Sequence, residues 1–130
     1  MTSSPSKLVI YVDDDPEDRM IMEDAFLNVK THHLMTLPHG NKLLDHLQAQ
    51  PVTASLIILD INMPFLSGLD VLRLLKSDAR YRNIPVVMFT TSSSSDDALK
   101  AKEYGADLVV KPASYRDAVT AIAGLLQHSA

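Results

Sequence analysis

Five short apolar runs follow one another along the chain, and the segments between them place their apolar residues three or four positions apart. The third run, Leu-Ile-Ile-Leu at 56–59, shows no alternation of apolar and polar residues, which is typical of a parallel strand buried on both faces. Within the segments between the runs, the spacing of apolar residues by three or four positions is typical of helices that bury one side. The predicted strands are Leu8–Val12, His33–Leu37, Leu56–Leu59, Ile84–Phe89 and Leu108–Val110.

This alternation of strands and helices predicts an α/β fold. Because crossovers between parallel strands are right-handed, the helices are expected to cover both faces of one five-stranded parallel sheet. In the sheet order 2-1-3-4-5, the first and third strands are neighbours and flank the point where the order reverses. Sites in such folds lie just outside the carboxyl ends of the strands.

Capping residues mark where the helices begin and end. Asp15 before Pro16 predicts the start of the first helix, which then runs to about Val29. Ser67 with Asp70 resembles a capping box at the start of the third helix. The remaining signals are Asn41 and Pro51 for the second helix, Asp96, Asp97 and Gly105 for the fourth, and Ser114 for the last.

Composition narrows the classes of function. The length of 130 residues suits one domain over residues 1–130, with a flexible N-terminus at 1–6. A net charge of −4 argues against a nucleic-acid surface, and the absence of cysteine excludes disulfides and thiolate catalysis. No apolar run approaches the roughly 20 residues of a membrane span, and no secretory signal is visible.

Polar residues follow four of the predicted strands at the point where each strand ends. Asp13 and Asp14 follow the first strand, Asp60 the third, Thr90 the fourth and Lys111 the fifth. Three carboxylates at one sheet edge would repel one another, because a like-charge pair at about 4 Å costs about 1 kcal/mol in water and more at lower dielectric. A hard divalent cation would offset that repulsion, and an all-oxygen site open to water suits Mg²⁺. Asn62 could add a backbone carbonyl to the metal.

Each of these residues also has an ordinary explanation. Asp13 and Asp14, with Asp15, could be a solvated acidic cluster before a helix. Lys111 and Thr90 could be strand-end residues without a special task. Their convergence from four strand ends favours a site instead. There, attack by the Asp60 carboxylate on a phosphoryl donor would form an aspartyl phosphate, and Thr90 and Lys111 would each hold one phosphoryl oxygen.

The sequence resembles the receiver domain of response regulators in two-component signalling. The resemblance covers the chain from about Lys7 to Gln127 and keeps the family's motif order. The motifs that carry it are Val12-Asp13-Asp14, Leu59-Asp60 with Met63-Pro64 and Gly68, Phe89-Thr90, Gly105-Ala106, and Lys111-Pro112. It implies a flavodoxin-like, three-layer (βα)5 sandwich similar to the chemotaxis regulators.

The resemblance also implies roles for single residues. Asp60 resembles the phosphoryl acceptor, and Thr90 and Lys111 resemble the hydroxyl and lysine that bind the phosphoryl group. Asp13 and Asp14 resemble the acidic pair that holds Mg²⁺, Asp14 directly and Asp13 through water, with the Asn62 carbonyl completing the site. The Lys111–Pro112 bond resembles the family's cis peptide, since a cis X–Pro bond costs only about 0.5–1 kcal/mol.

The implied biology is that of a stand-alone, cytoplasmic response regulator. Its phosphoryl donor would be a sensor histidine kinase, with phytochrome-type kinases among the candidates, or a phosphotransfer protein. Its downstream partner would be a protein that the sequence does not name. Neither a nucleic acid nor a membrane is expected as a partner, and a homodimer is left open. The protein would not be an enzyme beyond catalysing its own phosphoryl transfer and autodephosphorylation.

Two residues depart from the family pattern. Leu108 stands three positions before the lysine, where the family usually has an aromatic residue, and Thr91 follows the hydroxyl residue, where a small residue is usual. Leucine has no ring to rotate and no hydroxyl to re-pair. We therefore expect phosphorylation to change the surface of the fourth helix, fifth strand and fifth helix less, and the loops Met63–Gly68 and Thr91–Ser95 more.

Three other classes of function are alternatives to this interpretation of the sequence. A Mg²⁺-dependent aspartyl-phosphate hydrolase of the haloacid dehalogenase type would need a second Asp two residues after the nucleophile, where Asn62 stands. A flavodoxin-like FMN carrier would need a loop rich in hydroxyl groups and glycine after the first strand, where three aspartates stand. A pseudo-receiver that binds partners without phosphorylation is kept open by Leu108.

Overall fold

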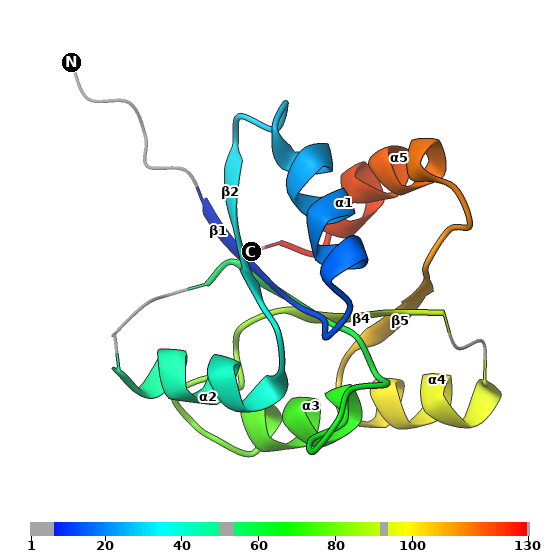
Figure 1. Cartoon of the computed structure of the whole chain (residues 1–130). Coiled ribbons are helices and arrows are strands. Elements are labelled where there is room, and N and C mark those ends of the chain that lie inside the picture. The colour runs from blue at the N-terminus through cyan, green and yellow to red at the C-terminus, as the bar shows by residue number, and fades with distance from the viewer. Residues whose placement is uncertain (1–6, 50–53, 92–93, 130) are drawn as a thin grey trace.

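The computed structural model describes residues 7–49, 54–91 and 94–129, in which five strands alternate with five helices (Figure 1). The predicted flexible segment 1–6 and the helix-ending Pro51 lie outside the described residues. The strands are β1 (Lys7–Val12), β2 (His32–Leu37), β3 (Leu56–Leu59), β4 (Val86–Thr90) and β5 (Asp107–Val110). The helices are α1 (Pro16–Phe26), α2 (Gly40–Ala49), α3 (Gly68–Lys76), α4 (Ser95–Glu103) and α5 (Tyr115–Leu126).

The five strands form one parallel sheet in the order β2-β1-β3-β4-β5. Helices α1 and α5 cover one face of the sheet, and α2, α3 and α4 cover the other (Figure 1). This arrangement confirms the predicted fold, sheet order and three-layer architecture. The order places the ends of β1 and β3 side by side, with Val12 opposite Leu59.

Alternating residues of the central strands feed two separate cores. On β1, Ile10 and Val12 face the core beneath α2, α3 and α4, whereas Val9 and Tyr11 face the core beneath α1 and α5. Side chains of a strand alternate between its faces, so a strand covered on both sides is apolar throughout. All four residues of β3 are fully buried, which confirms its prediction as a central strand.

Side-chain caps begin four of the helices. Asp15 caps α1, Ser67 caps α3, Ser94 caps α4 and Ser114 caps α5. Gly105 follows α4 with a φ of 88°, a left-handed conformation that glycine adopts without strain. Among the described residues, no helix has the length and apolar character to cross a bilayer.

Three helix boundaries differ from the prediction. Helix α4 begins at Ser95 with Ser94 as its cap, ahead of the predicted start at Asp96 and Asp97. Helix α1 ends at Phe26 rather than near Val29, because the Leu27 and Val29 N–H groups donate to carbonyls three residues back and close the helix with tight turns. Helix α2 begins at Gly40, ahead of Asn41. The Lys42 and Leu43 N–H groups both donate to the His39 carbonyl, at 3.2 Å and 3.4 Å, which makes Asn41 a helical residue instead of the cap.

The loop after β3 is held by a close backbone approach at Gly68. The Gly68 N–H donates to the Ile61 carbonyl at 2.8 Å, and a Cβ at position 68 would lie 2.0 Å from the Asp60 carbonyl oxygen. Only glycine fits against that backbone. Within the loop, Phe65 has a φ of 70° and is 90% exposed, a conformation that costs an L-residue roughly 1–2 kcal/mol.

Replacing Gly68 with alanine should destabilise the protein by about 2 kcal/mol or more, because backbone atoms must move to admit the methyl group. Urea unfolding measures the change. The matched control is Gly124→Ala in α5, where an added Cβ meets nothing within 4 Å. That substitution should instead stabilise by about 0.5–1 kcal/mol, as expected for Gly→Ala in a helix. Equal effects at the two positions would contradict the close approach.

Candidate functional site

Three carboxylates meet where β1 and β3 end. Asp13, Asp14 and Asp60 each offer an oxygen, and these oxygens lie within 4.8 Å of one another. The chain reaches this arrangement by continuing the sheet's hydrogen bonds one residue past each strand. The Asp60 N–H donates to the Val12 carbonyl at 3.0 Å, and the Asp13 N–H donates to the Leu37 carbonyl at 3.1 Å. The predicted convergence at the sheet edge is therefore present.

The three carboxylates differ in their surroundings. Asp13 is fully buried and Asp60 nearly so, whereas Asp14 is exposed. The two oxygens of Asp13 already accept hydrogen bonds, Oδ1 from the Asp15 N–H at 2.9 Å and Oδ2 from the Tyr11 hydroxyl and the Lys111 ammonium. Asp14 thus has the more open carboxylate, which fits direct contact with a metal ion for Asp14 and contact through water for Asp13.

This donor set fits a hard divalent cation. It consists of carboxylate oxygens, it carries excess negative charge, and it opens to water on the side of Asp14. Asn62 lies two residues beyond Asp60 in an exposed position of the same loop. Its backbone carbonyl as a further ligand stays a prediction.

Lys111 enters the site from the end of β5. Its ammonium lies 2.6 Å from Asp13, 2.7 Å from Asp18 and 3.2 Å from Asp60. Its backbone N–H donates to the Thr90 carbonyl at 2.8 Å, which ties the ends of β4 and β5 together. Thr90 is the last residue of β4 and is fully buried. Strand β4 is the neighbour of β3, which Asp60 follows. The structure therefore brings Lys111 to Asp60 and places Thr90 at the neighbouring strand end, as the sequence predicted.

Two residues of the site were missed by the sequence reasoning. Tyr11 lies two positions before Asp13, so both side chains leave the strand toward the same face, and the Tyr11 hydroxyl donates to Asp13 Oδ2. Asp18 lies in the first turn of α1, where an acidic residue is ordinarily explained by the helix dipole. The alternation on β1 could have indicated Tyr11, but no sequence signal distinguished Asp18.

The protonation of both hydrogen-bond donors follows from these contacts. Burial lowers the pKa of the Lys111 ammonium, but its hydrogen bonds to Asp13 and Asp18 more than offset burial and raise that pKa above its ordinary value. Burial and the Asp13 charge raise the pKa of the Tyr11 hydroxyl. Both groups therefore keep their protons at neutral pH and act as donors to Asp13.

The expected cis peptide at Lys111–Pro112 is wrong for this structure. The described residues, which include this bond, contain no cis peptide. An X–Pro bond prefers trans by about 0.5–1 kcal/mol, and the trans form here still delivers Lys111 to the carboxylates.

Comparison with known proteins identifies the family. Residues 9–123 match the response regulator receiver domain. The chain belongs to this family. The chemotaxis protein CheY1 of Helicobacter pylori is 30% identical over 105 residues, which cover 80% of this chain and 84% of CheY1. The response regulator Rcp1 of Synechocystis sp. is 33% identical over 107 residues, which cover 78% of this chain and 73% of Rcp1.

Solved structures of receiver domains share the fold. The phosphorylated cyanobacterial phytochrome response regulator RcpA superposes with a TM-score of 0.87 at 25% identity, over 95% of this chain and 93% of RcpA. The Mn²⁺-bound form of a response regulator named Rcp1 superposes with a TM-score of 0.81 at 26% identity, over 93% of this chain and 92% of that one. The resemblance and the receiver fold predicted from the sequence are confirmed.

The two residues that depart from the receiver pattern occupy different surroundings. Leu108 is half-buried on β5 opposite Met88 and packs against the core beneath α2, α3 and α4. Thr91 is exposed directly after Thr90. Leu108 therefore holds a packing position, in which a change of rotamer is limited by its neighbours.

Adding Mg²⁺ to the unmodified protein should shift the amide resonances of residues near Asp14 and Asp60, because the ion offsets the repulsion among three carboxylates. Asp14→Ala should abolish the response. Glu23→Gln, which removes an exposed charge elsewhere on α1, should leave it intact. A response that survives Asp14→Ala would remove Asp14 from the metal site.

Proposed function

We propose that the protein is a stand-alone response regulator whose Asp60 accepts a phosphoryl group in a Mg²⁺-dependent reaction. The observation that supports this most directly is the position of the Asp60 carboxylate, which shares one site with Asp13 and Asp14 and lies 3.2 Å from the Lys111 ammonium. This carboxylate has a metal-ligating set on one side and a cation on the other, as phosphoryl transfer requires.

The proposed step is a transfer between two nucleophiles. A carboxylate oxygen of Asp60 attacks the phosphorus of a phosphohistidine, the new O–P bond forms as the P–N bond breaks, and the electron pair of that bond returns to the imidazole. In this proposal Lys111 donates a hydrogen bond to one phosphoryl oxygen, and the Thr90 hydroxyl donates to another. A bound divalent cation supplies charge neutralisation for the phosphoryl oxygens.

Mg²⁺ is the proposed ion because its ligands are oxygen atoms and one side of the site is open to water. The Mn²⁺-bound Rcp1 relative supports a divalent cation of this kind. The proposed ligands are Asp14 and Asp60 directly, Asp13 through water, and the backbone carbonyl of Asn62.

The proposed partners follow from the relatives. The donor is a sensor histidine kinase or a phosphotransfer protein, and the likeness to the phytochrome response regulator RcpA favours a phytochrome-type kinase. The protein works in the cytoplasm and passes its signal to another protein by a change of binding. It acts as a switch, with no turnover beyond its own phosphorylation and dephosphorylation, and self-association into a homodimer is open to test.

Asp60→Asn should take up no phosphate, because the amide is not a nucleophile toward phosphorus. The measurement is intact-protein mass after incubation with acetyl phosphate and Mg²⁺. Wild type should gain one phosphate, and hydroxylamine should release it, as expected for an acyl phosphate. Asp78→Asn, which removes a carboxylate paired only with the nearby Arg80 among the described contacts, serves as the control and should behave as wild type. A wild-type protein that takes up no phosphate would favour the pseudo-receiver, and a phosphate on serine or histidine would exclude Asp60 as the acceptor.

Activation should change the loops beside the site more than the face around Leu108. A change at a packed leucine alters little of the protein surface. Phosphorylation can shift the balance between the inactive and active conformations only as far as it stabilises one of them more than the other. The measurement is an amide chemical-shift comparison with and without beryllofluoride. We expect the largest changes at Met63–Gly68 and Thr91–Ser95, of which residues 92–93 lie outside the described structure. Larger changes around Leu108 and Ser114–Ile122, with those loops unchanged, would contradict this.

A further inference from the structure

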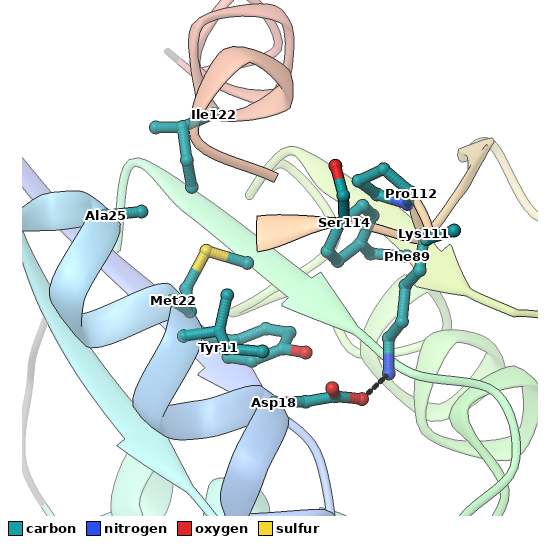
Figure 2. A pocket seen from close by; sticks show the side chains of 11 residues that line it. Tyr11, Asp18, Met22, Ala25, Phe89, Lys111, Pro112, Ser114 and Ile122 are labelled. Carbon is teal, nitrogen blue, oxygen red and sulfur yellow. Dashed lines mark hydrogen bonds and ion pairs between the residues drawn. The ribbon is translucent and has the colours of Figure 1, made fainter. Parts of the chain in front are cut away.

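The Lys111 ammonium has three N–H donors and three carboxylate neighbours. Two contacts are short, to Asp13 at 2.6 Å and Asp18 at 2.7 Å, and the contact to Asp60 is longer at 3.2 Å. In Figure 2 the Lys111 side chain extends to Asp18, with the Tyr11 ring beside the pair. Asp18 belongs to α1, so a helix on one face of the sheet supplies an acceptor for the lysine that follows β5.

Phosphorylation changes only one of these three acceptors. When Asp60 becomes an acyl phosphate, its carboxyl group is no longer charged and the negative charge lies on the phosphoryl oxygens, so the donor that pointed at Asp60 becomes available to one of those oxygens. Asp13 and Asp18 keep their charges and their shorter contacts. The other two donors therefore stay engaged and fix the nitrogen, so that the third N–H is directed at the transferred group.

We propose that Asp18 is a positioning residue for phosphoryl transfer, which acts by holding the Lys111 ammonium from the side of α1. This inference rests on the proposed function. Asp18 touches neither the acceptor nor the phosphoryl group, and it acts through Lys111.

The helix itself does not need the Asp18 side chain. Asp15 caps α1 and accepts from the Glu17 N–H at 2.9 Å. The adjacent residue Arg19 donates to the Asp13 carbonyl at 2.7 Å and so anchors this turn of α1 to the end of β1. The backbone that carries Asp18 is thus held by other contacts, and the Asp18 carboxylate is directed at Lys111.

The surroundings of the lysine explain why a third carboxylate matters. The Lys111 side chain is only 9% exposed, and a buried ammonium is costly unless its donors are satisfied. A cavity of about 140 Å³ lies beside it, lined by Tyr11, Met22, Phe89 and Ile122 along with Asp18 and Lys111. Without Asp18, the ammonium has one acceptor fewer and room in this cavity to leave the position from which it faces Asp60.

The test compares Asp18→Ala, Asp18→Asn and the control Glu17→Gln. Glu17 is an exposed acidic residue of the same helical turn, so its change removes a charge without a contact to Lys111. The first readout is the rate of Asp60 phosphorylation by acetyl phosphate with Mg²⁺. Asp18→Ala should be slower by about tenfold, equivalent to about 1.4 kcal/mol. Asp18→Asn, which keeps an acceptor oxygen, should lose less, and Glu17→Gln should stay within about twofold.

The second readout follows Lys111 directly in the unphosphorylated, metal-free protein. The two Hε protons of a lysine have separate chemical shifts when the side chain is held and converge when it moves. They should be separate in wild type and Glu17→Gln and should converge in Asp18→Ala, with the Lys111→Arg variant identifying the signal. Far-UV circular dichroism verifies that each variant is folded. If Asp18→Ala does not fold, both readouts are taken from Asp18→Asn instead.

The outcomes separate this inference from the proposed function. A wild type that takes up no phosphate on Asp60 overturns the proposed function and this inference with it. A wild type that is phosphorylated normally, with Asp18→Ala equally fast or faster, overturns the role of Asp18 alone. Unchanged Lys111 Hε shifts in Asp18→Ala also overturn it, because the lysine is then held without Asp18.

Discussion

Repulsion among carboxylates at one edge of the sheet is the constraint on which the rest of the site depends. Asp13, Asp14 and Asp60 lie within a few ångströms of one another, and Asp18 adds a fourth negative charge nearby. The Lys111 ammonium is the cation that contacts three of the four. One positive charge cannot balance them all, so the set of carboxylates fits a divalent cation, on which the proposed phosphoryl transfer depends.

The scaffold keeps these charges together by means that do not involve them. Asp13 and Asp60 each follow a strand buried on both faces, and backbone hydrogen bonds extend the sheet by one residue into the site. Gly68 brings the start of α3 against the Asp60 carbonyl, which leaves the loop little freedom. Hydrophobic burial of the strands and close backbone packing thereby offset the cost of collecting like charges.

The site is connected to the core beneath α1 and α5 through one aromatic side chain. The Tyr11 ring packs in the core beneath α1 and α5 and meets Phe89 edge-on, with ring centroids 6.4 Å apart, while its hydroxyl reaches Asp13. Leu108 packs in the other core and carries no polar group. An aromatic hydroxyl therefore joins the site to the α1–α5 side, whereas the position on β5 offers only apolar packing.

The sequence by itself determined the fold and which residues lie at the strand ends. Runs such as Leu56–Leu59 are typical of strands buried on both faces, and the direction of parallel strands then places Asp13, Asp60 and Lys111 at one edge. Tertiary structure alone decided the partners of Lys111 and the trans form of the Lys111–Pro112 bond. Asp18 and Lys111 are 93 positions apart. Their contact depends on how α1 docks on the sheet and on which rotamers the packing allows, and neither is encoded in a local pattern.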